Sequence, residues 1–191
     1  MSKFLRIALL AGLGVIVAAS AAFAVVPDPT FSIVGNCLVI APGGEYPFSV
    51  TVKDQFANPI NNSAVTVDFT LAPAAHLCSG ADAGFTVSGA TITGHTNVSG
   101  QVTFTIHGGG SATGTIKVYA DGVQIGSLAK CTSPDLNGDK VINVADLGLF
   151  ATAQAGQNLA ADLNCDGFVN VADLGLFASS QALHAGDVHC P

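Results

Sequence analysis

The pattern of apolar and polar positions changes once along the chain, near residue 132. Before that point, several short runs alternate between larger apolar residues and polar ones, which predicts β-strands that bury one face. The runs cover residues 46–53, 64–71, 101–107 and 115–120. Segments rich in Asn, Pro and Gly separate them and predict tight connections. We therefore expect antiparallel strands that form a two-sheet sandwich over residues 36–131.

After Ser133-Pro134 the period becomes that of a helix. Apolar residues recur at i, i+3, i+4 and i+7 in two segments, which predicts two helices with one apolar stripe each. The two stripes consist of Val144, Leu147, Phe150 and Ala151, and of Val171, Leu174, Phe177 and Ala178. Gly148 and Gly175 occupy the same place in the two helices, which predicts a close approach between them there.

An internal repeat covers this helical region. Residues 135–154 and 162–181 are identical at 14 of 20 positions, with an offset of 27 residues. A helical repeat without a ligand would not need identical Asp and Asn positions. The polar positions of the repeat should therefore have a chemical function.

The spacing of oxygen-bearing side chains in each repeat is typical of a calcium-binding loop. Each loop offers Asp or Asn at positions 1, 3, 5, 9 and 12 and a backbone carbonyl at position 7, which is the ligand order of an EF-hand. Zn²⁺ would prefer His or Cys. We expect two Ca²⁺ ions, one in each loop. The expected ligands are Asp135, Asn137, Asp139, Val141, Asn143 and Asp146 in the first acidic loop (residues 135–146), and Asp162, Asn164, Asp166, Phe168, Asn170 and Asp173 in the second acidic loop (residues 162–173).

Two positions depart from the EF-hand pattern. Position 12 is Asp rather than Glu in both loops. Position 6, where the turn favours Gly, is Gly167 in the second loop but Lys140 in the first. A Lys held at positive φ costs about 1 kcal/mol, so we expect the first site to be the weaker one.

The first residues predict export. Lys3 and Arg6 precede an apolar run over residues 7–19, and Ala22-Phe23-Ala24 has the small-x-small pattern of a signal-peptidase site. The run is shorter than the ~20 residues of a membrane span, so we expect residues 1–24 to be a cleaved signal peptide and residues 25–35 to be a linker. The rest of the chain has four Lys and 13 acidic residues, a net charge of 4 − 13 = −9. This charge disfavours nucleic acids and anionic membranes as partners.

Five cysteines in an exported chain favour disulfide bonds. Cys165 stands at position 4 of the second acidic loop, where a side chain points outward, and we expect it to pair with Cys190 in the C-terminal tail. Among Cys37, Cys78 and Cys131 the sequence favours no particular pair.

No feature of the sequence favours an enzyme. Glycoside hydrolysis needs two carboxylic acids, but Glu45 is the only Glu and six of the 12 Asp belong to the acidic loops. His76, His95 and His107 have no nucleophile motif beside them. With no Trp and only two Tyr, a sugar-binding surface of stacked aromatic rings is also disfavoured. We expect no catalytic residues.

The C-terminal repeat resembles type I dockerin modules over residues 135–181. Pro134 directly precedes the first ligand, so no full helix enters that loop, and each loop leads out into a helix. The resemblance implies a small all-α domain over residues 132–191, made of two loop-helix EF-hand-like repeats. It also implies docking onto a cohesin-like domain in extracellular polysaccharide-degrading or cell-surface assemblies. The family's partner contacts fall on positions that are apolar here, namely Val144, Ala145, Val171 and Ala172.

A second resemblance concerns the alternating region. Residues 50–54 (VTVKD), 58–60 (NPI) and 65–67 (VTV) resemble the opening of a bacterial Ig-like domain of the invasin type. The predicted fold class is therefore a mainly β, Ig-like sandwich followed by the small all-α domain. Two functions are compatible with it. One is a secreted, non-catalytic adaptor that docks onto a cohesin-like partner. The other is an extracellular structural or adhesive protein in which calcium only stabilises the fold.

Overall fold

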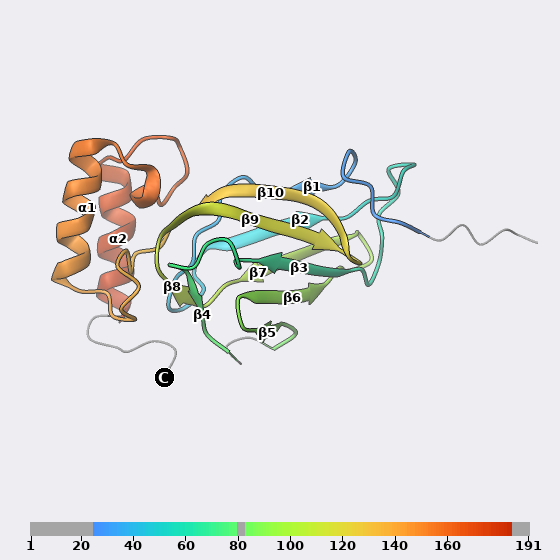
Figure 1. Ribbon diagram of the computed structural model, residues 1–191, viewed down its shortest axis with the longest axis horizontal. Helices are drawn as coiled ribbons and strands as arrows, with labels where there is room; N and C mark the ends of the chain where they lie inside the picture. The colour runs from blue at the N-terminus through green and yellow to red at the C-terminus, as the bar shows by residue number, and fades with distance from the viewer. Residues whose placement is uncertain (1–24, 80–82, 185–191) are drawn as a thin grey trace, which may run out of the picture.

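The computed structural model describes residues 25–79 and 83–184. The predicted signal peptide and Cys190 lie outside these described residues. Strands form an elongated body, and two helices stand side by side at one end of it (Figure 1). We call residues 25–131 the β part and residues 132–184 the helical part. No helix of the described chain is both long and apolar enough to cross a membrane.

The β part contains three antiparallel groups of strands. Five strands pair in the order β10-β9-β3-β6-β5, three in the order β1-β2-β7, and β4 pairs with β8. Their bounds are β1 (Ile33–Val34), β2 (Pro47–Thr51), β3 (Ala64–Asp68), β4 (His76–Leu77), β5 (Thr86–Ser88), β6 (Thr91–His95), β7 (Gln101–Thr105), β8 (Gly108–Gly109), β9 (Ala112–Ala120) and β10 (Val123–Cys131). Within the segment predicted to be a linker, residues 33 and 34 form β1 and pair with β2.

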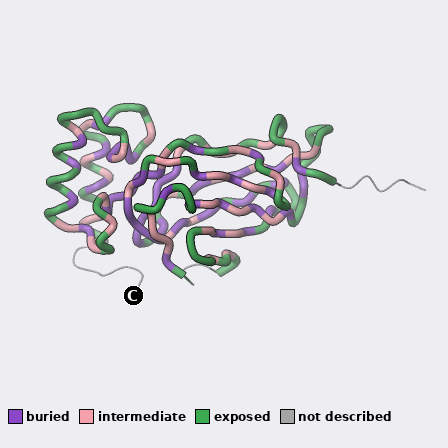
Figure 2. The backbone as a smooth tube through the Cα atoms, in the orientation of Figure 1, coloured by how far each residue is buried: buried purple, intermediate pink, exposed green. Residues whose placement is uncertain are grey.

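The main core lies between the five-stranded and three-stranded sheets. Burial alternates along β2, β3 and β7, as the period of two predicts. Phe48 on β2 and Phe104 on β7 are buried, and their ring centroids lie 6.4 Å apart. Figure 2 shows buried residues alternating with less buried ones along the strands of the β part.

Strand β10 does not follow the alternation, and the sequence pattern does not predict it. Its pairing with β9 shifts register between Gln124 and Gly126 and again between Leu128 and Lys130. Each irregularity resets which side of the strand faces the core. The apolar residues Ile125, Leu128 and Cys131 are therefore buried at a spacing of three.

The helical part contains α1 (Val144–Gly156), the 3-10 turn η1 (Leu159–Ala161) and α2 (Val171–His184). Phe150 and Phe177 meet between the two α-helices, with ring centroids 5.8 Å apart. This second core is completed by the β part, because Val39 is buried in it and Cys37 and Tyr46 pack against it. The helices thus bury their apolar faces partly against the β part.

The predicted apolar stripes are wrong in part. Phe150 and Phe177 are buried, but Val144 and Val171 are 77% and 76% exposed. In α1 the buried face consists of Asp146, Phe150 and Ala153. This face includes a carboxylate because the acidic loop, and not the helix core alone, fixes the orientation of the first helical turn.

The predicted close approach at Gly148 and Gly175 is also wrong. A Cβ atom added at either glycine would meet no atom within 4 Å. Both glycines lie on the outer, solvent-facing side of their helices.

The fold class predicted from the sequence, an Ig-like sandwich followed by an all-α domain of two EF-hand-like repeats, is wrong. The described strands form open sheets of three, five and two strands. The helical part has two α-helices and is not a pair of EF-hand repeats, because the first acidic loop follows β10 and the second follows only the three-residue turn η1. Since the core of the helical part also contains Val39 of the β part, it is not a self-sufficient all-α domain.

Candidate metal centre

The first acidic loop is closed by its first and last carboxylates. Asp135 accepts hydrogen bonds from the backbone N–H groups of Gly138 (2.8 Å) and Lys140 (3.1 Å). Asp146, which lies in the first turn of α1, accepts from the backbone N–H groups of Asn137 (3.2 Å) and Asn143 (2.9 Å). The two side chains therefore wrap the intervening backbone around one point.

Three carboxylates converge at that point. Oxygens of Asp135, Asp139 and Asp146 all lie within 4.8 Å of one another, and Asp135 and Asp146 are completely buried. Burial raises the pKa of Asp146, and the neighbouring charges of Asp135 and Asp139 raise it further, against the two backbone N–H groups that lower it. Like charges held together, two of them away from water, favour a bound cation or a proton.

The asparagines of this loop have partners of their own. Asn143 caps α1, because its Oδ1 accepts from Ala145 N (2.7 Å) and its Nδ2 donates to the carbonyl of Val141 (3.2 Å). Asn137 Oδ1 accepts from Asp139 N, and its Nδ2 donates to Asp139 Oδ2 (2.9 Å). Of the six predicted ligand residues, the structure brings the three carboxylates together, while Asn137 and Asn143 make hydrogen bonds within the loop.

The second acidic loop is also closed by its first and last carboxylates, with partly different backbone donors. Asp162 accepts from the N–H groups of Asp166 and Gly167, both at 3.1 Å. Asp173 accepts from Leu163, Asn164 and Asn170. Asp162 and Asp173 are buried. Among the residues that the structure describes, only the carboxylates of the first loop converge within 4.8 Å.

Remaining contacts of the second loop match those of the first. Asn164 Oδ1 accepts from Asp166 N and its Nδ2 donates to Asp166 Oδ2, while Asn170 Oδ1 accepts from Ala172 N at the start of α2. The backbone N–H of Phe168 and the side chain of Asn164 donate to Asp166 and lower the pKa of this exposed carboxyl. The side chain of Phe168 is exposed, so this residue offers the site only its backbone carbonyl.

Each loop contains one residue other than glycine in the left-handed region. Lys140 has φ 73°, as the sequence predicts, and Gly138 beside it has φ 72°. In the second loop Gly167 has φ 88° and Cys165 has φ 56°. Each loop therefore bears the steric cost of one non-glycine residue at positive φ, Lys140 in the first and Cys165 in the second. Lys140 thus gives no reason to expect weaker binding at the first loop than at the second.

The β part contacts the first aspartate of both loops. At the first loop, Gly110 N donates to the backbone carbonyl of Asp135 (2.8 Å), and His76 Nε2 lies 3.9 Å from Asp135 Oδ2. At the second loop, Lys130 Nζ lies 3.1 Å from Asp162 Oδ2. The sequence does not predict these contacts, because they depend on how β4, β8 and β10 lie against the loops.

The disulfide prediction is wrong. Cys165 pairs with Cys37, 128 residues earlier in the chain, and not with Cys190. Pairing depends on which segments the fold brings together, and here the strand-free segment before β2 passes beside the second loop. Cys78 is also disulfide-bonded. Cys131 is free and buried, and burial raises the pKa of its thiol to about 11.

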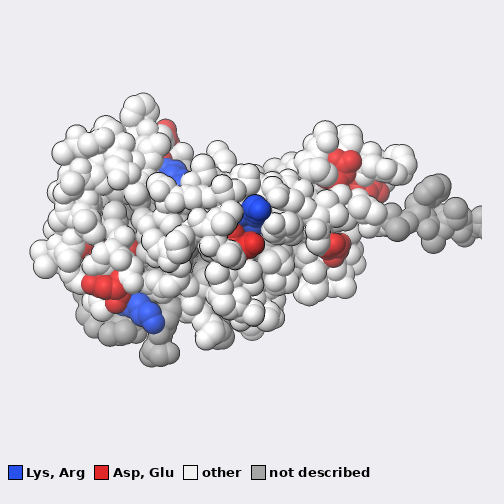
Figure 3. Space-filling model, viewed as in Figure 1, with Lys and Arg blue, Asp and Glu red and all other residues white. Residues whose placement is uncertain are grey.

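The predicted partner-contact residues lie at the surface. Val144, Ala145, Val171 and Ala172 are all exposed in the first turns of the two helices. Lys, Arg, Asp and Glu side chains are sparse on the face of the molecule shown in Figure 3, including the area over the helices. On this face, the helical end is mostly uncharged.

Comparisons with known proteins add no family to this description. Neither the models of protein families, nor the curated proteins, nor the solved structures include a match to this chain. The Asp and Asn side chains of the acidic loops carry hard oxygen atoms, which suit a cation such as Ca²⁺.

Proposed function

We propose that this chain is an exported, non-catalytic protein that binds one Ca²⁺ in each acidic loop and docks onto a partner protein through its helical part. The observation behind the calcium proposal is the convergence of Asp135, Asp139 and Asp146 within 4.8 Å, two of them without solvent exposure. A cation offsets the repulsion between these buried carboxylates. The second loop is included because its first and last aspartates, Asp162 and Asp173, also accept hydrogen bonds from the loop backbone.

Calcium fits this donor set better than other common ions. The loops offer carboxylate, amide and carbonyl oxygens, and Ca²⁺ accepts six to eight such ligands in flexible geometry. Mg²⁺ requires near-octahedral coordination and retains several waters, which a loop that encloses its centre on several sides disfavours. The disulfide between Cys37 and Cys165 is compatible with the oxidising conditions met by an exported protein.

Calorimetric titration of wild-type protein and of two single-loop variants tests calcium binding. We expect two sites in the wild type and one site in each of Asp135→Asn and Asp162→Asn. At a free calcium concentration of 100 times Kd, each occupied site adds about 2.7 kcal/mol to the free energy of unfolding. Asp68→Asn is the matched control, because this carboxylate lies on β3 and accepts from Thr70 outside the loops. Unchanged heat in both loop variants would reject the assignment.

Docking is proposed from the exposed starts of the two helices. Val144 and Val171 occupy equivalent positions of the repeat and are 77% and 76% exposed, so each of the two helices begins with an apolar side chain in solvent. The resemblance to dockerin modules makes a cohesin-like domain the partner to test. Because the calcium loops precede these helical turns directly, docking should depend on calcium.

Titration against a panel of cohesin domains, with calcium and with chelator, tests docking. We expect calcium-dependent binding that the double variant Val144→Asp/Val171→Asp abolishes. Val98→Asp is the control, since Val98 is 80% exposed and lies in the connection between β6 and β7. Calcium-dependent stability without binding to any cohesin would favour the other function, an extracellular structural or adhesive protein.

A further inference from the structure

Residues 37–41 form a short extended segment that lies between the two cores of the molecule. Leu38 and Ile40 are buried in the main core, whereas Val39 between them is buried in the second core. Successive side chains of an extended backbone point to opposite sides, so three neighbouring residues reach both cores. None of these three side chains is more than 3% exposed. We call residues 37–41 the bridging segment.

The backbone of the bridging segment is hydrogen-bonded to both parts of the chain. Thr132, the first residue of the helical part, donates from its N–H to the carbonyl of Leu38 (3.0 Å), and its own carbonyl accepts from Ile40 N (2.8 Å). At the other end of the segment, Ala41 N donates to the carbonyl of Ile106 (3.3 Å), just after β7. The segment is thus held between the junction of the two parts and the β part itself.

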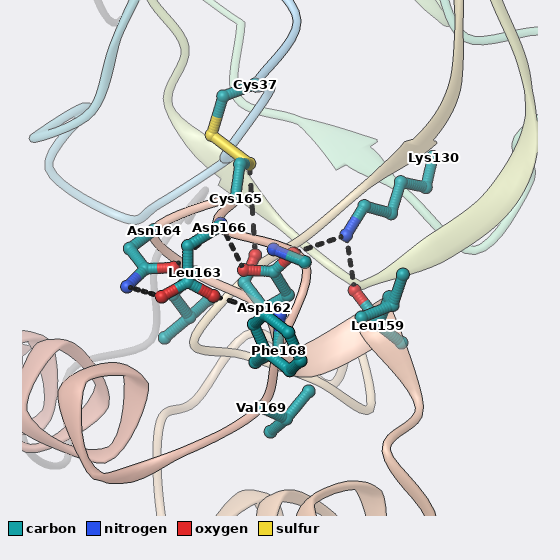
Figure 4. A network of polar contacts seen from close by, with 12 residues as sticks. Cys37, Lys130, Leu159, Asp162, Leu163, Asn164, Cys165, Asp166, Phe168 and Val169 are labelled. Carbon is teal, nitrogen blue, oxygen red and sulfur yellow. Dashed lines mark hydrogen bonds and ion pairs between the residues drawn. A yellow bond between two sulfur atoms is a disulfide. The ribbon is translucent and has the colours of Figure 1, made fainter.

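The acidic loops also pack into the second core. Ile142 of the first loop and Val169 of the second loop stand at the same position of the repeat, and both are 1% exposed in the cluster that contains Val39. The second loop is also bonded to the bridging segment through Cys37 and Cys165, drawn in yellow in Figure 4. Opening of either loop therefore removes part of the core in which Val39 is buried.

We propose that the bridging segment couples the two parts, so that ions in the acidic loops stabilise the β part as well as the helical part. This inference rests on the proposed calcium binding and concerns its effect on the rest of the chain. The β part then gains stability from ions that are bound outside it. A helical part that folded as a separate unit would instead leave the β part indifferent to calcium.

The coupling follows from the burial that the two parts share. When the loops open without an ion, Val39 loses apolar neighbours, and water reaches this side chain and the backbone hydrogen bonds beside Thr132. Exposed apolar surface and lost hydrogen bonds both cost free energy. Because Leu38 and Ile40 flank Val39 directly, the main core loses the support of the same segment. The chain should therefore unfold in one transition.

The two tyrosines of the chain report on the two cores separately. Tyr46 packs against the second core, whereas Tyr119 lies on β9 and pairs with Thr66 of β3. Because the chain has no Trp, the substitution Tyr46→Phe leaves the emission of Tyr119 as a probe of the β part. Circular dichroism of the helices follows the helical part in the same sample.

Thermal unfolding of the intact Tyr46→Phe chain, in calcium at about 100 times Kd and in chelator, tests the coupling. We expect the Tyr119 emission and the helical signal to change at one temperature, and calcium to raise that temperature by at least about 10 °C. The added substitution Val39→Asp places a charge in the second core, which separates the helical part from the bridging segment. Calcium should then move the Tyr119 transition by less than about 2 °C.

Val67→Ala is the control for a loss of packing alone. Val67 is fully buried on β3 and belongs to the main core, so both transitions should fall together and keep their full response to calcium. Val39→Ala is the matched variant at the bridging segment, and calcium should shift its Tyr119 transition less than its helical transition. Every variant retains the bond between Cys37 and Cys165, so a lost response reports on packing and not on the disulfide.

The outcomes separate this inference from the proposed function. A helical transition that responds to calcium while the Tyr119 transition does not would overturn the coupling and leave calcium binding intact. A Val39→Asp protein whose Tyr119 transition keeps the full calcium shift would overturn the role of the bridging segment. Two transitions that both ignore calcium in the Tyr46→Phe protein would instead contradict the proposed function. If Val39→Asp does not fold, the comparison of Val39→Ala with Val67→Ala decides the question.

Discussion

The substitution Gly109→Ala should damage the first acidic loop from outside it. Gly109 belongs to the short strand β8 and is buried. A Cβ atom at this position would lie 2.2 Å from Asp135 Oδ2 and 2.8 Å from His76 Cε1. The backbone of β8 therefore approaches Asp135, the first residue of the loop, too closely to leave room for a side chain at position 109.

The loss of stability can be worked out from the groups that the added methyl group would displace. A carbon and an oxygen need a separation of ~3.2 Å, so the carboxylate or the strand must shift by about 1 Å. Such a shift breaks the hydrogen bond that Lys140 N donates to Asp135 Oδ2 at 3.1 Å. Loss of a bond to a buried charge costs ~1.5–3 kcal/mol, and overpacking a filled site costs ~1–3 kcal/mol. We expect the variant to be less stable by about 3–5 kcal/mol and to bind calcium in the second loop alone.

Urea unfolding followed by circular dichroism measures the stability, since the chain has no Trp for fluorescence. Gly148→Ala is the matched control, because a Cβ atom there meets no atom within 4 Å and Ala stabilises a helix interior by about 1 kcal/mol relative to Gly. A Gly109→Ala protein with wild-type stability and two calcium sites would refute the argument that Asp135 is held in place by β8.

Three further results are expected. Phe150→Ala removes a buried ring that contacts Phe177 and should lower the free energy of unfolding by about 3–5 kcal/mol, as measured by urea unfolding in calcium. In chelator, the pKa of Asp146 is raised in the folded state, so its ionisation opposes folding as the pH rises. As the pH falls toward the ordinary carboxyl pKa of 3.8, wild type should therefore gain stability relative to Asp146→Asn. The thiol of Cys131, with its pKa raised to about 11, should resist iodoacetamide at pH 8 in the native protein and react in urea, as judged by the mass gained.

The positions of the acidic loops could be predicted from the sequence because their Asp and Asn residues are local in sequence and occur twice. Each oxygen-bearing residue stands at a fixed number of positions after the first Asp of its loop. The loop then folds through hydrogen bonds between residues no more than ten positions apart. The alternating strands were predictable for the same reason, since one face of β2 or β3 is buried without interruption.

The remaining features depend on contacts between distant segments. The pairing of Cys165 with Cys37 and the contact of Lys130 with Asp162 arise only after β10 and the segment before β2 lie beside the second loop. Strand β10 itself escaped the alternation because its two register shifts break the period of two. The helical stripes were misplaced because Val144 and Val171 fit an apolar stripe by spacing, whereas the loop turns them toward solvent.

Native mass spectrometry of the intact chain tests the central claim most directly, because it counts bound ions. At ~1 mM Ca²⁺, at the upper end of the Kd range of extracellular calcium-binding modules, we predict two calcium ions per chain in the wild type and one ion in both Asp135→Asn and Asp162→Asn. A wild-type chain that carries no calcium under these conditions, with the same mass before and after chelation, would contradict the account.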